Sequence, residues 1–143
     1  MANKIGWQWF ALGSALFAGL TAIFGKLGVA EINSNLATLI RTAVILVICT
    51  AIVAVRGEWE PMSNLSAKGV TFLCLSALAT GLSWLCYYRA LQTGPASRVA
   101  PIDKLSVAFV IVLAWLVLGE PMTWRLCLGG SLVVAGALIL ATG

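Results

Sequence analysis

Three charged residues lie deep inside apolar segments of the sequence, where charges are costly. Arg41 interrupts the run ATLIRTAVIL at residues 37–46, and Asp103 and Lys104 stand side by side in SRVAPIDKLSVAFV at residues 97–110. Arginine keeps its positive charge at any biological pH, whereas a carboxylate takes up and releases protons. Such groups could bind an ionic solute and couple its movement to protons, so all three are candidate substrate or coupling residues.

Five further residues are candidates for the same site because they fall at the same ends of the predicted apolar segments. They are Lys26, Arg89, Trp84, Tyr88 and Asn35. Lys26 could instead extend its amine to the membrane surface. Trp84 and Tyr88 share one helix face, where they would either pack between helices or form a stacking wall for a substrate. Asn35 either lines the same vestibule or belongs to a helix cap.

The depth of Asp103 depends on where its helix begins. A start at Pro95 and a rise of about 1.5 Å per residue place Asp103 about 12 Å into its segment, and Arg41 about 10 Å into its own. A start at Pro101 would put Asp103 in the first turn, where free N–H groups favour a carboxylate. A fixed counter-ion for Arg41 or Arg89 is the third interpretation, and the sequence leaves all three open.

The Asp103 and Lys104 side chains are expected to point in different directions. Neighbouring side chains on a helix point about 100° apart, so we do not expect the two charges to neutralise each other. We expect them to straddle a wet cavity and a neighbouring helix. Pro101 is predicted to kink this helix, because it removes a backbone hydrogen bond and frees a carbonyl. The kink would serve packing or border a cavity.

The sequence shows no metal, cofactor or catalytic constellation. Histidine is absent, and the four cysteines occur without the spacing of metal ligands. Lysine and arginine are scattered singly, without the basic run that nucleic-acid binding favours. We therefore expect no metal, no cofactor, no nucleic-acid partner and no enzymatic activity.

The elements that position the candidates must be membrane helices. The 143 residues are 61% hydrophobic and 10% charged, and the mean hydropathy is +1.01. A soluble domain carries about 25% charged residues because its surface meets water. We expect one all-α transmembrane domain over residues 1–143, in contact with the lipid bilayer.

Five segments are long and apolar enough to cross a bilayer. They cover residues of about 5–29, 34–55, 67–91, 95–118 and 123–142. The membrane face at which residue 1 lies is called side A here, and the opposite face side B. Trp7, Trp9, Trp59 and Trp124 all fall at side A, as in an aromatic interface belt.

An odd number of spans and a balanced charge leave the orientation open. Lysine and arginine in short loops normally mark the cytoplasmic face. Side A carries Lys4, Arg56, Lys68 and Arg125, and side B carries Lys26, Arg89 and Arg98, with Arg41 and Lys104 deeper. Either the charge rule is weak here, or the chain inserts in both orientations and pairs with itself.

The second half of the chain resembles an EamA-type unit of the drug/metabolite transporter superfamily. The matching features are Gly94-Pro95-Ala96, Pro101, Gly119-Glu120-Pro121 and the glycine run from Gly129 to Gly136. FGKLGV at 24–29 and ATLIRTAVIL at 37–46 fit more loosely. The resemblance implies five helices that form half of an inverted-repeat transporter, whose relatives usually carry two units in one chain.

A single unit then needs a partner to complete the repeat interface at which such transporters bind substrate. An antiparallel homodimer is the favoured interpretation, and a related five-span protein is the rival partner. The cationic cluster favours an anionic or zwitterionic solute. We therefore expect a secondary transporter, an exporter by resemblance, that works by alternating access.

A lipid-headgroup flippase and a non-transporting subunit of a heteromeric pair are the alternative functions. Under each of these functions, the expected location of the protein is the inner (plasma) membrane of a bacterium or archaeon.

Overall fold

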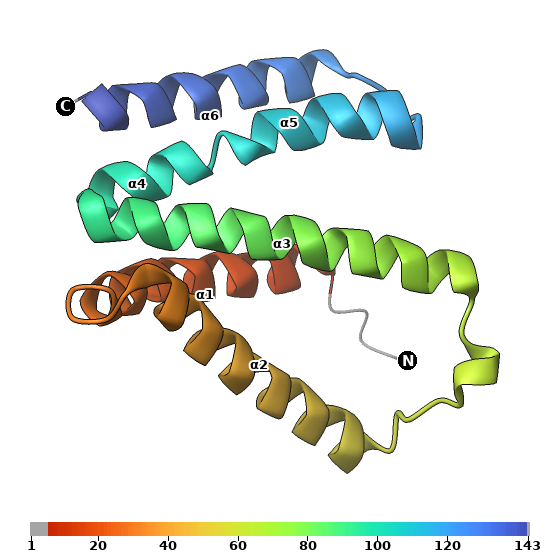
Figure 1. Cartoon of the computed structure of the whole chain (residues 1–143). Coiled ribbons are helices and arrows are strands. Elements are labelled where there is room, and N and C mark those ends of the chain that lie inside the picture. The colour runs from red at the N-terminus through yellow and green to blue at the C-terminus, as the bar shows by residue number, and fades with distance from the viewer. Residues whose placement is uncertain (1–5, 143) are drawn as a thin grey trace. The chain divides into compact units, whose positions relative to one another are not determined.

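The computed structural model describes residues 6–142. All regular secondary structure in that range is helical, and 84% of the residues lie in helices. Five helices are long and apolar enough to span a membrane (Figure 1). Large apolar side chains are exposed along all of them, as expected where lipid replaces water as the solvent. The predicted all-α fold with five spans is confirmed, and the chain is an integral, multi-pass membrane protein.

Four of the spans lie within two residues of their predicted bounds. They are α1 (Trp7–Gly28), α2 (Ser34–Arg56), α3 (Ala67–Thr93) and α6 (Trp124–Thr142). A short 3-10 helix, η1 (Met62–Asn64), lies between α2 and α3. The four tryptophans of the predicted belt, Trp7, Trp9, Trp59 and Trp124, are between 67% and 75% exposed.

The fourth span is broken into pieces. It consists of α4 (Ala96–Asp103), α5 (Ser106–Leu113) and a π-helical turn, η2 (Ala114–Leu118). At the break the Lys104 and Leu105 amides bond to Pro101 and Ile102, three residues back, instead of four. The prediction of a kink near Pro101 is thus refined, because α4 ends at Asp103, two residues after the proline.

Two glycines in the left-handed conformation end the second and fourth spans. Gly57 has φ 65° and closes α2 with amide bonds from Gly57 to Ala54 and from Glu58 to Val53. This is a Schellman motif, a helix stop that favours glycine. Gly119, at φ 69°, follows η2, and the next amide reaches back six residues to Ala114 because the π turn adds one residue.

The chain divides into two compact units. The α2–α3 unit is Gly25–Gln92 and holds the last turn of α1 with α2 and α3. The α4–α6 unit comprises the described residues up to Phe24 and those from Thr93 to Thr142. In the second of these, α6 packs against both α4 and α5.

Candidate functional site

The polar face of α2 begins with a cap. Asn33 is the N-cap residue, and its side-chain oxygen accepts the Asn35 amide at 2.9 Å. Ser34 and Thr38 follow on one face and are buried, with the Thr38 hydroxyl donating to the Ser34 carbonyl at 2.9 Å. The Asn35 residue is exposed. Its part in this site is its backbone amide, which donates to the Asn33 side chain.

Arg41 continues that face one turn deeper and meets two aromatic rings of α3. Its guanidinium carbon lies over the Trp84 ring, 4.0 Å from the centroid, and 5.4 Å from the Tyr88 centroid. Both distances are within the range of cation–π attraction. The predicted pairing of Trp84 and Tyr88 on one face therefore holds, and the α2–α3 unit brings both to Arg41.

Tyr88 is buried where α3 packs closely against α1. Tyr88 is 4% exposed and Leu91, one turn further along α3, is fully buried. A Cβ added at Gly25 would lie 3.1 Å from the Tyr88 hydroxyl oxygen and 3.4 Å from Leu91 Cδ1. Glycine at this position therefore lets α3 approach the backbone of α1 closely.

Lys26 contacts the C-terminal part of α3 directly. Its Nζ donates to the Leu91 carbonyl at 2.6 Å. A cation near the last carbonyls of a helix is favoured by their partial negative charge. Lys26 thus joins α1 to α3, a use that the sequence interpretation of a surface-seeking lysine did not include.

Gln92 is the residue that sequence reasoning missed. Its Nε2 lies 3.4 Å from the Val29 carbonyl and 3.3 Å from the Ile32 carbonyl, so two long hydrogen bonds hold the α1–α2 turn. Arg89 donates to Gln92 Oε1 at 3.0 Å, which leaves the amide nitrogen facing the turn. A polar residue next to a helix end, opposite a turn rich in carbonyls, is the signal that could have identified it.

Asp103 and Lys104 lie in the α4–α6 unit and form an ion pair. Lys104 Nζ and Asp103 Oδ2 are 3.1 Å apart. The prediction that the two neighbours could not neutralise each other is wrong. It assumed a continuous helix, but α4 ends at Asp103, and Lys104 adopts φ −72° and ψ −8° as its C-cap.

Beside the ion pair, a pocket of about 420 Å³ lies between α4 and α6. Pro101 and the Lys104 stem form one wall, and Gly136 and Ala137 belong to the other. The lining is apolar apart from the lysine. The helix break therefore places the charged side chain of Lys104 at the edge of an apolar pocket.

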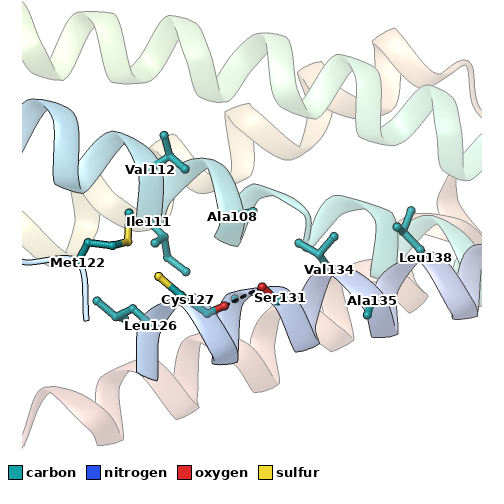
Figure 2. A pocket seen from close by; sticks show the side chains of 11 residues that line it. Ala108, Ile111, Val112, Met122, Leu126, Cys127, Ser131, Val134, Ala135 and Leu138 are labelled. Carbon is teal, nitrogen blue, oxygen red and sulfur yellow. Dashed lines mark hydrogen bonds between the residues drawn. The ribbon is translucent and has the colours of Figure 1, made fainter. Parts of the chain in front are cut away.

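A second apolar groove, of about 470 Å³, runs between α5 and α6 (Figure 2). Small residues of α6, Cys127, Ser131 and Ala135, line it together with Ala108 and Ile111. The Ser131 hydroxyl donates to the Cys127 carbonyl at 2.8 Å, so its hydrogen is bound within α6. No polar group in this groove is arranged for chemistry within the described chain.

A metal site has no support in residues 6–142, where no group of three or more possible ligands converges. Arg41, Trp84 and Tyr88 meet in the α2–α3 unit and are named here the Arg41 cluster, while Lys26 and Gln92 of the same unit bond to backbone carbonyls. A cation held on aromatic rings within a span suits an ionic solute.

The fold and this cluster are those of a multi-pass membrane protein with charge inside its spans. Residues 5–142 match the EamA-like transporter family. The chain belongs to that family, as its resemblance predicted. No solved structure matches it significantly.

The chain is also similar in sequence to three curated proteins. An uncharacterized transporter in the cobO 3′ region of a Sinorhizobium species is 54% identical over 135 residues, covering 94% of this chain and 96% of that protein. The uncharacterized transporter YvbV of Bacillus subtilis is 29% identical over 136 residues, 92% of this chain and 43% of YvbV. ArnF of Erwinia tasmaniensis, a probable 4-amino-4-deoxy-L-arabinose-phosphoundecaprenol flippase subunit, is 40% identical over 70 residues, 48% of this chain and 55% of ArnF.

Proposed function

We propose that this protein is a secondary transporter that exports a small anionic or zwitterionic metabolite. The observation that carries the proposal is Arg41, a permanent cation about 10 Å into α2 and 4.0 Å from the Trp84 ring centroid. Ionisable groups at such depth face a cavity or a partner and mark solute pathways. Transporter membership supports the same conclusion.

The working form is an antiparallel homodimer in the inner membrane of a bacterium or archaeon. YvbV supports this, since the present chain covers 43% of its length and YvbV therefore has room for a second unit. The odd number of spans and the balanced loop charge support insertion in both orientations. Alternating access then arises when one protomer tilts against the other.

Uptake into proteoliposomes tests the transport proposal. The purified chain is reconstituted and offered labelled succinate, glycine and tetraphenylphosphonium, with and without a pH gradient. We expect uptake of the anionic or zwitterionic probe and none of the lipophilic cation. Uptake of tetraphenylphosphonium alone would contradict the proposed charge preference.

The second candidate is a subunit of a lipid-headgroup flippase. The likeness to ArnF, a probable flippase subunit, favours it. Affinity purification from the native membrane separates the two functions. Recovery of the chain only in complex with a different five-span protein supports the subunit, whereas recovery of the chain paired with itself supports the homodimer.

A further inference from the structure

The donors of Arg41 lack an acceptor in the described part of the chain. Its contacts there are the rings of Trp84 and Tyr88. A ring face attracts the positive charge, but it offers no lone pair to the N–H groups along the guanidinium edge. A guanidinium has five such N–H donors and no acceptor of its own.

The position of Arg41 makes these free donors costly. The residue lies one turn below the buried Thr38, in a span with mean hydropathy 2.4. A polar donor that leaves water without gaining an acceptor loses free energy on folding. A ligand that binds at this place would supply the missing acceptor.

The neighbouring cations are already engaged. Lys26 donates to the Leu91 carbonyl and Arg89 donates to Gln92. In the α2–α3 unit, Arg41 is thus a cation that contacts aromatic rings while its N–H groups have no acceptor among the described residues. The Arg41 guanidinium carbon lies 4.0 Å from the Trp84 ring centroid, and its N–H groups, which have no acceptor in the described chain, are left to meet a ligand.

We infer that the edge of Arg41 binds an oxyanion, a carboxylate or phosphate group of the transported solute. The fork of N–H groups matches the two oxygens of either group and forms two parallel charge-assisted hydrogen bonds. Trp84 and Tyr88 are positioning residues that fix the plane of the fork. This inference rests on the proposed function and adds the recognition chemistry of its substrate.

Binding in nanodiscs tests the inference independently of transport. The full chain is placed in phosphatidylcholine discs and titrated with inorganic phosphate or succinate, with chloride at equal ionic strength as reference. Trp84 emission, isolated by subtraction of the Trp84→Phe spectrum, and the unfolding midpoint both report binding. Because this cation carries the fork, Arg41→Lys should weaken binding about tenfold or more.

Matched variants separate recognition from charge and folding. Arg56→Lys makes the same change on the same helix, at a residue whose partner is Glu58 at 2.7 Å, and should leave binding unchanged. Trp84→Leu should weaken binding severalfold, as measured by the shift of the unfolding midpoint. Trp84→Phe should bind nearly as well as the wild type. Equal affinity in Arg41→Lys and the wild type would overturn the inference.

Two further arms identify the source of the oxyanion and the rival acceptor. If phosphatidylglycerol in the discs competes with phosphate only when Arg41 is present, the oxyanion is a lipid headgroup; without competition it is a free solute. Binding that appears only in Asp103→Asn would overturn the inference, because Asp103 would then occupy the edge. Arg41-dependent binding without transport of any probe would contradict the proposed function alone.

Discussion

At the scale of single residues, Gly25 sets how closely α1 approaches the ring that supports Arg41. We expect Gly25→Ala to lower the free energy of unfolding by about 1–3 kcal/mol, because its Cβ would press on the Tyr88 hydroxyl. Gly28→Ala is the control on the same helix, since a Cβ there meets nothing within 4 Å. Thermal unfolding in detergent compares them, and equal midpoints would contradict the close packing.

Asp103 is the carboxylate that we expect to carry proton coupling. Asp103→Asn should abolish pH-driven uptake into proteoliposomes, because the amide cannot release a proton at this site. The fold should persist, since an ion pair between partly exposed neighbours contributes only about 0–1 kcal/mol.

Glu120→Gln, a loop carboxylate outside the helices, is the control for Asp103 and should transport normally. Unchanged uptake by Asp103→Asn would remove that residue from the mechanism.

The positions of the candidate residues along the spans could be predicted from sequence, but their contacts could not. Depth in an apolar segment identifies Arg41, and a four-residue spacing identifies the shared face of Trp84 and Tyr88. The contact between them depends on two helices meeting, which no local pattern encodes. Gln92 escaped notice because its role arises only when the end of α3 lies beside the α1–α2 turn.

At the scale of elements, Gln92 anchors the turn between α1 and α2 to α3. Gln92→Glu removes both N–H donors and sets a carboxylate against the Val29 and Ile32 carbonyls. We expect amide hydrogen exchange in residues 29–33 to accelerate about fivefold to thirtyfold, equivalent to about 1–2 kcal/mol. Gln8→Glu, an exposed site on α1, should leave that exchange unchanged.

The break in the fourth span tests what a proline does inside a membrane helix. Pro101→Ala supplies the missing N–H, so we expect a continuous helix, slower amide exchange at residues 104–107 and a higher unfolding midpoint. Pro121→Ala, in the loop before α6, is the control without such an effect. Fast exchange that persists in Pro101→Ala would show that the break has another cause.

Span bounds follow from apolar length, and therefore the outer bounds of all five predicted spans agree with the structure within two residues. The sequence did not locate the break. Pro101 shows where a backbone N–H donor is missing, but it does not show where the helical hydrogen bonds change from four residues back to three. That shift appears downstream, at Lys104 and Leu105. Because the break lies at Lys104, the prediction that Asp103 and Lys104 would not pair was wrong.

At the scale of the whole molecule, charge placement should control pairing. Met62→Lys with Asn64→Lys adds positive charge to side A, and Ala30→Lys with Glu31→Lys adds it to side B. We expect each double variant to insert in one orientation and to lose transport, because an antiparallel pair can no longer form. Co-expression of the two should restore it.

A C-terminal reporter read on both membrane faces checks the insertion of the two charge variants, and the proteoliposome assay checks their activity. Full transport by either double variant alone would contradict the antiparallel pair.

The stacked guanidinium has one consequence for how transport responds to acidity. Arginine stays protonated across the biological range, so the attraction at this position never switches off. With Arg41 as the recognition point, a weak acid is cargo only in its dissociated form. Acidifying the medium then depletes the charged form of the cargo without removing the charge of Arg41. Two weak acids of different strength should therefore lose binding to one protein at two different pH values.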